Sequence, residues 1–507
     1  MTTLRNHQFR SQDDAAVSAL LWQKFAYNVR DNLLAEVAVQ ALRLGGTVVL
    51  ARALAPDDFG LLKILLLIGV LVALVNEAGI PDALIQRRDL GPAQEATAWW
   101  ISSALTLVFA GGLYAVAPII GCLMHMAGLS WGLRLLCLPL VLEGTAVTAG
   151  ARLRRDLKFN TLALDDVLGE LAFLVGALAL LYLRLPEWSL PGGMAARLAA
   201  HGLTIWLVAG YIPRQRPRLE AARDLHKFAL SACGGRFLTT VSSNADYLLV
   251  GRLLGSSALA FYSMAWDILR LIPDRLYRVV GRVTLPAFCK LQHDDRQLAN
   301  AHREFSDYIA RMVLPIVACA ALAAPELFST IYGSRWTPAA TRLRLLALAL
   351  ATVGLRIGIG SVFYAKVRPI IDVYLHAARL TLIVVTVGLL APIGLGAVSV
   401  GMSAVEFAIS IAGEYAACRL VGLRFWELIR ALFSGIRVAL FCALATLVGK
   451  ALVLASELSG PTALVVISLP PLATFVWLES SNAMKMIGCA FRSQKPQVAG
   501  AAQQANW

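Results

Sequence analysis

FGLLKILLLIGVLVALVNEAGI, residues 59–80, is a run of 22 residues in which Lys63 and Glu77 are the charged positions. An α-helix needs about 20 mostly apolar residues to cross the hydrocarbon core of a bilayer. The next such run, TAWWISSALTLVFAGGLYAVAPII at 97–120, carries no charged residue. Similar runs follow one another over almost all 507 residues, with short polar segments between them. The pattern predicts an all-α polytopic membrane protein.

About fourteen transmembrane helices are expected, and they use roughly 280 residues. Little of the chain is left for a soluble domain, so we expect no separate catalytic domain and no enzyme activity. The expected spans lie near 32–54, 59–80, 97–120, 131–150, 162–182, 188–212, 228–251, 258–282, 307–328, 343–365, 370–391, 394–418, 431–450 and 461–480.

The composition agrees with a membrane protein: 58% of the residues are apolar, 15% are charged and the mean hydropathy is +0.67. Soluble domains have about a quarter charged residues. The formal charge of +14 could suggest a nucleic-acid partner, but Lys and Arg recur in every second loop and form no single patch. We therefore expect membrane lipids, and no nucleic acid, as partners.

The distribution of the basic residues predicts the orientation. If the N-terminus is cytoplasmic, about 27 Lys and Arg residues fall in inside segments and about six in outside loops. One missed or invented span would invert every later loop and destroy this asymmetry, so fourteen spans are favoured over thirteen. Both termini are expected to face the cytoplasm. Residues 1–31 lack the apolar core of a cleavable signal peptide.

No motif for catalysis, metal binding or cofactor binding stands out in the sequence. The eight cysteines show no CxxC pairing, and the seven histidines include no two at a metal-ligand spacing on one helix. A glycine-rich phosphate loop and a nucleophile motif are also missing from the sequence. The expectation is therefore no catalytic residue, no metal and no cofactor.

An internal repeat divides the chain. ARALAPDDFGLL at 51–62 aligns with GRLLGSSALAFY at 251–262, so that Arg52 falls on Arg252. Both segments lie at the outer end of the first span of a half. We therefore expect two six-helix lobes related by a pseudo-two-fold axis along the membrane normal, plus two C-terminal helices, with a site between the lobes near the midplane.

The expected organisation follows from this repeat. It comprises a cytoplasmic N-terminal segment at 1–31, an N-lobe of spans 1–6 at 32–212, a cytoplasmic linker at 213–227, a C-lobe of spans 7–12 at 228–418, spans 13 and 14 at 419–480, and a cytoplasmic tail at 481–507.

Polar residues inside the spans indicate where a site would lie, because a charge at the bilayer centre costs about 2.5–3.5 kcal/mol on insertion scales. Spans 1 and 7 each carry a polar stripe on one helix face, and the offset of 200 residues places positions 36, 40 and 43 on positions 236, 240 and 243. The stripe of span 1 is Glu36, Gln40, Arg43 and Thr47, and that of span 7 is Arg236, Thr240, Ser243 and Asp246.

These stripes have two interpretations, ordinary helix contacts within each lobe or the lining of a hydrated cleft between the lobes. Other charged residues inside the spans raise the same question. Arg356, near mid-membrane in span 10, should need an anionic partner or ligand. Span 8 places Asp267, Arg270 and Asp274 on one face, and the remaining intramembrane acids, for which salt bridges are expected, are Glu170, Glu406 and Glu414.

Several segments resemble the polysaccharide transporter (Wzx-type flippase) family of the multidrug/oligosaccharidyl-lipid/polysaccharide exporter superfamily. The resemblance covers roughly residues 30–430 and rests on order and spacing. The segments are RALAPDDFG at 52–60, GIPDALIQRRDL at 79–90, RRDLKF at 154–159, NADYLLVGRLLGSSALAFYSMAWDI at 244–268 and LPAFCKLQHD at 285–294.

The resemblance implies a lipopolysaccharide or exopolysaccharide flippase of the bacterial inner membrane that carries undecaprenyl-pyrophosphate-linked oligosaccharide across by alternating access. Its partners would be this lipid-linked substrate and other proteins of polysaccharide assembly. A dianionic pyrophosphate needs cations in the cleft. The candidate substrate-binding residues are Arg43, Arg236, Arg270, Arg356, Gln40 and Ser243, and the candidates for ion coupling are Asp246 and then Glu36.

Two other classes remain open. A drug or cation antiporter of the same superfamily could use the same architecture, although it would favour an acidic and aromatic cleft. A membrane-embedded glycan polymerase or ligase would suit the same substrate, but such enzymes commonly expose a large periplasmic loop and the outside loops here are short.

Overall fold

The computed structural model describes residues 34–77, 81, 84, 91–126, 128–211, 213, 215–456, 458 and 460–493. At 219–236, 272–283 and 480–493, and at a few single positions, the structure describes the backbone but not the side chains. The expected cytoplasmic segment 1–31, most of the segment at 79–90 and the last part of the tail therefore lie outside the described residues.

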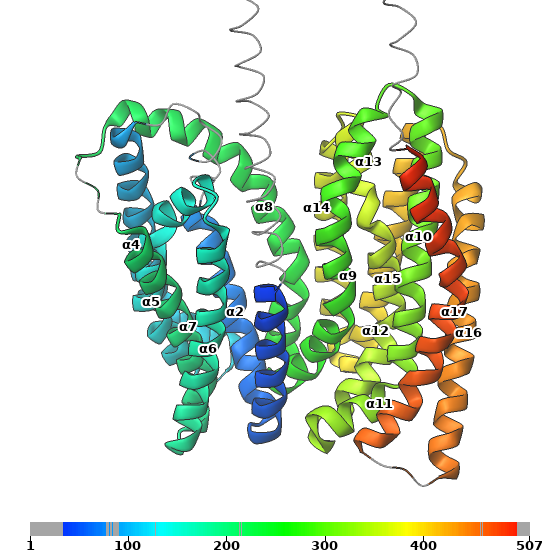
Figure 1. The fold of residues 1–507 in the computed structure, drawn as a ribbon. Helices are drawn as coiled ribbons and strands as arrows, with labels where there is room; N and C mark the ends of the chain where they lie inside the picture. Colours follow the sequence, from blue (N-terminus) through cyan, green and yellow to red (C-terminus); the bar gives the residue numbers. More distant parts are fainter. Residues whose placement is uncertain are drawn as a thin grey trace, which may run out of the picture. The chain divides into compact units, whose positions relative to one another are not determined.

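All regular structure in the described part of the chain is helical (Figure 1). Each of the fourteen expected spans coincides with a long helix, which confirms the all-α fold. The long helices are Leu34–Ala53, α2 (Pro56–Glu77), α4 (Pro92–Met124), α5 (Leu129–Arg155), α6 (Phe159–Tyr182), α7 (Pro186–Ala209), α8 (Leu219–Leu254), α9 (Ser256–Lys290), α10 (Asp295–Leu322), α12 (Thr337–Leu355), α14 (Ile370–Leu390), α15 (Leu395–Val421), α16 (Phe425–Ala455) and α17 (Pro461–Ser493).

Eight of these helices, counted over the described residues, are long and apolar enough to cross a membrane. The helices extend beyond the apolar windows that predicted them. The ninth span was expected at 307–328, but α10 begins at Asp295, twelve residues earlier. The first turns of α10 are polar, so a search for apolar runs does not include them although they are helical. Asp294 caps this start by accepting a hydrogen bond from the Gln297 amide at 2.9 Å.

Short elements interrupt two of the expected spans. α10 is followed by the single turn α11 (Ala324–Leu327) and a π-helical turn at Phe328–Tyr332. The tenth span is not one continuous helix, because α12 ends at Leu355, a 3-10 turn covers Arg356–Gly358, and α13 (Ile359–Ala365) completes the span. The break falls at the arginine that the sequence analysis placed near mid-membrane.

The chain forms two compact units, residues 1–263 and 264–507. The lobe boundaries predicted from the repeat, with a linker at 213–227, stay a prediction. In the first unit α4 packs on α5, α5 and α6 pack on α7, and α8 packs on α2 and α4. Small residues allow close contact. A Cβ at Gly144 of α5 would lie 2.1 Å from Thr106 of α4.

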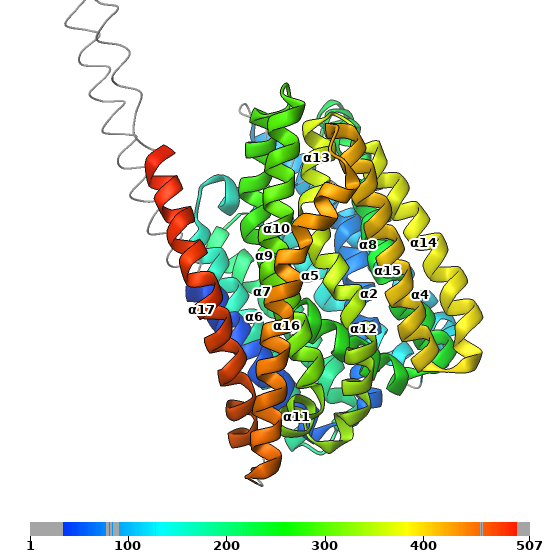
Figure 2. The ribbon, with the colours of Figure 1, turned by 90° about the vertical axis from the view of Figure 1, so that its right-hand side faces the viewer.

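In the second unit α10 packs on α16, α16 on α17, and α15 on both α12 and α14 (Figure 2). Gly435 of α16 lies against the backbone of Ala310 in α10, and Gly449 lies against α17. An ion pair of 2.7 Å joins Lys450 of α16 to Glu326 of α11. The helices of spans 13 and 14 are thus part of the second unit.

The two turns of the internal repeat contact each other within the first unit. The helix Leu34–Ala53 and α2 meet at one turn, and α8 and α9 meet at its equivalent 200 residues later. The Ser256 hydroxyl donates a hydrogen bond to Asp57. Gly60 lies so close to Ser256 that a Cβ at position 60 would stand 2.0 Å from the Ser256 carbonyl oxygen. The glycine allows this approach.

Candidate functional site

Glu406 of α15 is the centre of a buried ion cluster in the second unit. Its side chain is 0% exposed, and the Arg379 guanidinium of α14 binds it through Nε at 2.8 Å and through Nη2. Arg356 reaches the second carboxylate oxygen with Nη2 at 3.3 Å. Two arginines from different elements thus share one buried acid, so Arg356 has the anionic partner that its position in the membrane demands.

Arg356 lies in the helix break at 356–358. It is the first residue of the 3-10 turn between α12 and α13, and Gly358 in the same turn packs closely on Phe305 of α10. Arg356 keeps 23% of its side chain exposed, whereas Arg379 keeps 4%. Arg356 can therefore contact a ligand while Arg379 holds Glu406.

The charged groups around this cluster include one more cation and one more acid. Arg270 of α9 is near enough to act electrostatically on both Arg356 and Glu406, and its guanidinium carbon lies 4.5 Å from the ring centroid of Trp266. Asp372 of α14 also acts on Arg356. Arg270, Arg356 and Arg379 against Glu406 and Asp372 leave one net positive charge. We call these five residues the arginine cluster.

The first unit has a different charge balance. Glu170 of α6, 5% exposed, accepts from Arg43 Nε at 3.1 Å and pairs with Arg197 of α7 at 3.2 Å. The Arg43 side chain remains 47% exposed. The polar stripe of the first helix therefore faces α6 through Arg43, and Gly46 on the same helix packs against Leu174 of α6.

Acids outnumber the arginines next to this pair. Asp165 of α6 lies 2.9 Å from Nδ1 of His201 on α7. Asp166 has four electrostatic neighbours in this region: His201, Asp165, Glu36 and Arg197. We call Glu36, Asp165, Asp166, Glu170, Arg43, Arg197 and His201 the acidic cluster of the first unit.

Asp246, the first candidate for ion coupling, is 0% exposed in the first unit. It accepts a hydrogen bond of 2.9 Å from the Tyr262 hydroxyl. Tyr262 stacks edge to face on Tyr247, with ring centroids 5.9 Å apart, and the Lys63 ammonium lies 4.6 Å from the Tyr247 ring centroid. The segment NADYLLVGRLLGSSALAFY thus builds a buried polar and aromatic core around Asp246.

Less is known of the surroundings of the remaining predicted residues. Gln40 and Ser243 are half-buried in the first unit. The side chains of Arg236 and Asp274 lie outside the described residues. The cleft expected between the lobes, and the assignment of these residues to it, stay predictions. The expected salt bridges of Glu170 and Glu406 are confirmed, because both acids bind arginines, and Glu414 hydrogen-bonds His302 at 3.0 Å.

Six residues that complete these clusters were not among the candidates from the sequence: Arg379, Asp372, Arg197, His201, Asp165 and Asp166. Each lies inside an expected span, where a charged or titratable residue is costly and is a functional candidate by default. That signal could have found them. Their partners could not be read from the sequence, because Arg379 and Glu406 are 27 residues apart and Arg43 and Glu170 are 127 apart.

Comparison with known proteins decides the family. The family model described as polysaccharide biosynthesis protein matches residues 49–341, which is more than half of the chain. The chain belongs to this polysaccharide biosynthesis protein family. The match confirms the resemblance drawn from the quoted segments. It ends before Arg356, so the arginine cluster extends beyond the part of the chain that the family model covers.

One curated relative of this polysaccharide biosynthesis protein is the lipopolysaccharide biosynthesis protein WzxC of Escherichia coli (strain K12). The two are 23% identical over 354 residues, which is 69% of this chain and 71% of WzxC. Among solved structures, the lipid II flippase MurJ in an inward closed conformation is similar, with a TM-score of 0.67 and 12% identity over 89% of this chain and all of MurJ.

A second solved structure is an inward-facing multidrug resistance transporter of the MATE family, in the MOP superfamily. Its TM-score is 0.63, with 17% identity over 76% of this chain and 94% of that protein. The fold of this polysaccharide biosynthesis protein is therefore shared with transporters of lipid-linked and of drug-like substrates. The choice between these substrates must come from the chain's own charged residues.

Proposed function

We propose that this protein flips an undecaprenyl-pyrophosphate-linked oligosaccharide from the cytoplasmic to the periplasmic leaflet of the bacterial inner membrane, for the synthesis of a surface or exported polysaccharide. Membership of the polysaccharide biosynthesis protein family and the fold shared with a lipid II flippase support this function. Alternating access of the two lobes would carry the substrate, with both termini of the chain in the cytoplasm and other proteins of polysaccharide assembly as partners.

The arginine cluster is the observation that supports the substrate class. A pyrophosphate diester carries two negative charges and cannot cross hydrocarbon unless cations replace its water. Arg356 and Arg379 present planar guanidinium groups, which match phosphate oxygens in pairs. Glu406 holds both arginines in place before the substrate arrives, and the net positive charge of the cluster favours an anion. Arg356, being partly exposed, would make the direct contact.

Arg43, with almost half of its side chain exposed, would contact the substrate from the first unit. Arg236 and Arg270 would complete the cationic lining, and Gln40 and Ser243 would supply hydrogen bonds to polar groups of the substrate. If single Ala replacements of Arg43, Arg236, Arg270 and Arg356 all left export unchanged in a protein that still inserts, this assignment would be wrong.

A coupled cation would use the first unit. The acidic cluster contains four carboxylates against two arginines and one histidine, which favours a cation such as a proton or Na⁺. Asp246 is the first candidate for ion coupling, and Glu36, the second candidate, belongs to this cluster. Their alternative role is to compensate the neighbouring cations. Transport that is insensitive to proton and sodium gradients would remove the coupling proposal.

Drug efflux is the main competing function, because the fold is also that of a multidrug transporter. A cationic drug would be repelled by the net positive charge of the arginine cluster, whereas an anionic lipid headgroup would be attracted. A glycan polymerase or ligase would need a catalytic site, for which the sequence offers no motif.

The leaflet distribution of undecaprenyl-pyrophosphate-linked oligosaccharide, in a host with this gene deleted and in the same host with the gene on a plasmid, tests the proposal. Accumulation on the cytoplasmic side that the plasmid relieves is the expected result. Accumulation of unpolymerised units on the periplasmic side would favour a polymerase or ligase. An unchanged distribution would favour drug efflux.

A further inference from the structure

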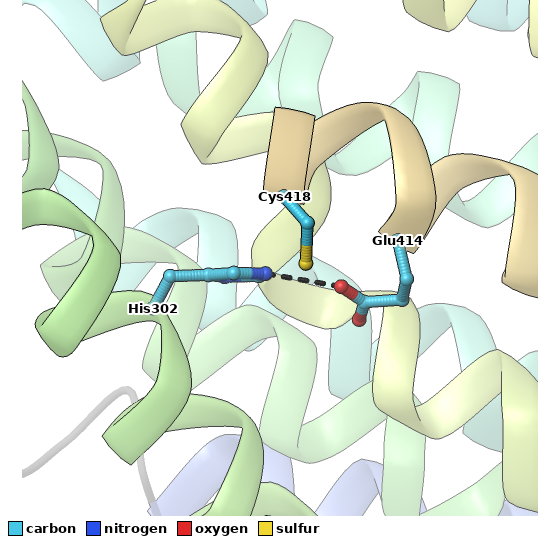
Figure 3. A group of neighbouring side chains, drawn as sticks. All are labelled: His302, Glu414 and Cys418. Carbon is cyan, nitrogen blue, oxygen red and sulfur yellow. Dashed lines mark hydrogen bonds and ion pairs between the residues drawn. The ribbon is translucent and has the colours of Figure 1, made fainter. Parts of the chain in front are cut away.

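A second buried cluster in the second unit has donor atoms suited to a metal ion. His302 lies near the start of α10, while Glu414 and Cys418 lie one turn apart on α15 (Figure 3). His302 Nε2 is 3.0 Å from Glu414 Oε2, and the imidazole nitrogen, the carboxylate oxygen and the Cys418 sulfur lie within 4.8 Å of one another. A search of the described residues for three or more His, Cys, Asp or Glu side chains that could share a metal ion finds this group.

The surroundings of these three side chains are apolar. Cys418 belongs to a hydrophobic core that includes Leu298, Val362, Phe363 and Val421. The His302 side chain is 0% exposed and that of Glu414 is 10% exposed. A carboxylate in such a place is costly unless a positive charge compensates it. A bound divalent cation would supply that charge.

We propose that His302, Glu414 and Cys418 bind one Zn²⁺ ion. Zinc takes histidine nitrogen, carboxylate oxygen and thiolate sulfur as ligands, at about 2.0–2.3 Å. A divalent ion would be neutralised by one carboxylate and one thiolate, so no net charge would remain in the apolar core. Binding would release the thiol proton of Cys418 to bulk water. A water molecule would complete the four ligands.

The geometry requires small movements. Ligand atoms of a tetrahedral zinc site lie about 3.3–3.6 Å apart. The three donor atoms would have to close by at most about 1.5 Å, which side-chain rotation about α15 and α10 can supply. Because Glu414 and Cys418 are four residues apart on one helix, they already point to the same side. The slight exposure of Glu414 offers the entry side for the ion.

The expected role of the ion is to fasten α10 to α15. Both helices pack together in the second unit, and α15 also packs on α12, α13 and α14. Glu406, the centre of the arginine cluster, lies on α15 two turns before Glu414. A metal clip at the end of α15 would therefore hold the helix that presents Glu406. The donor atoms have no part in the arginine cluster itself.

Metal content of the purified full chain tests this site. We expect about one Zn²⁺ per chain after purification with added Zn²⁺ and removal of loose ions. Cys418→Ser and Glu414→Gln should each lose most of this zinc. Cys442→Ser is the matched control, because Cys442 is also buried in the second unit but bonds the Pro471 carbonyl oxygen, and it should keep its zinc.

A measurement on the unmodified protein guards against variants that fail to fold. Co²⁺ added to the metal-free chain should give the intense near-ultraviolet band of thiolate-to-cobalt charge transfer, and Zn²⁺ should remove the band by competition. Zinc below about 0.1 per chain together with no cobalt band would overturn the proposal. So would zinc that remains in the Cys418→Ser chain. A chain that binds zinc but flips no lipid would leave the metal site standing and remove the proposed function instead.

Discussion

Arg356 Nη2 lies 3.3 Å from Glu406 Oε2, and Arg379 binds the other oxygen of the same carboxylate. Glu406 is fully buried, so its charge depends on these two partners. Removal of one partner from a buried ion pair leaves an uncompensated charge and costs about 3–5 kcal/mol. The ion pairs of Glu406 are therefore expected to make the stability of the 3-10 turn at Arg356 depend on the middle of α15.

Glu406→Gln should lower the melting temperature of the purified protein by more than about 5 °C, because the buried Arg379 and the partly exposed Arg356 lose their acid. The double variant Glu406→Gln/Arg379→Gln also removes one cation. Its melting temperature should therefore fall by less than the sum of the decreases in the two single variants. Thermal unfolding in detergent measures all four proteins. Strictly additive shifts would show that Arg379 and Glu406 do not depend on each other.

Arg356→Gln should reduce substrate export by about 10-fold to 100-fold, the loss expected for one charged hydrogen-bonding partner of a phosphate. Arg356→Lys should restore part of it, since the charge is kept but the planar fork is lost. Arg344→Gln is the control on α12, where an exposed arginine bonds the Ala321 carbonyl oxygen, and it should export normally. Equal export by Arg356→Gln and wild type would exclude Arg356 from substrate binding.

Arg43→Gln should separate transport from stability. Glu170 keeps Arg197 as a partner when Arg43 is removed, and a half-exposed ion pair contributes at most about 1 kcal/mol. We expect a nearly unchanged melting temperature and a fall in export of several-fold. Glu170→Gln is the comparison, because it leaves two arginines without their acid and should destabilise the protein. A large loss of stability in Arg43→Gln would indicate a packing role.

How much of this architecture could be predicted from the sequence depends on the length scale. Apolar runs predict which segments form membrane-spanning helices, and all fourteen expected spans coincide with long helices. Helix ends were missed where polar turns continue the helix outside the apolar window, as at Asp295. Ion-pair partners such as Arg379 and Glu406 were missed because helix packing, which hydropathy does not encode, decides which distant charges meet.

Metal-ligand patterns show the same limit. His302 and Glu414 are 112 residues apart, and a search for short spacings on one helix could not join them. The spacing of Glu414 and Cys418 by four residues was visible but carries little information alone. The repeat was more informative, since its two equivalent turns meet at Asp57 and Ser256.

The contact between those turns predicts a pH effect. The hydrogen bond from Ser256 lowers the pKa of Asp57 below its usual 3.8. A carboxyl with a lowered pKa in the folded state stabilises the protein above its unfolded pKa, and the contribution is lost as the pH falls through the folded value. Ser256→Ala should therefore melt below wild type at pH 5–7, and the difference should shrink below about pH 3.8.

Asp58 acts in the opposite direction, because burial raises its pKa. Comparison of wild type with Ser256→Ala cancels this effect, since Asp58 is present in both. Melting temperatures measured from pH 3 to 7 give the result. A difference between the two proteins that does not change with pH would show that Ser256 acts through packing and not through the Asp57 carboxylate.

Gly60→Ala tests the close approach of the same two turns. The added Cβ would stand 2.0 Å from the Ser256 carbonyl oxygen, so backbone must move. Overpacking of this kind costs about 1–3 kcal/mol. We expect a lower melting temperature or reduced membrane expression. Gly112→Ala is the control, because nothing lies within 4 Å of a Cβ there. Equal stability of the two variants would contradict the contact between the turns.

The most direct test of the proposed function is flipping by the purified protein. Proteoliposomes containing undecaprenyl-pyrophosphate-linked oligosaccharide would be probed with an external enzyme that modifies only the glycan in the outer leaflet. We expect wild type to make nearly all of the glycan accessible within minutes, and Arg356→Gln to slow this exposure by about 10-fold or more. Glycan exposure no faster than in protein-free liposomes, in a preparation that is folded and inserted, would contradict the proposed flippase function.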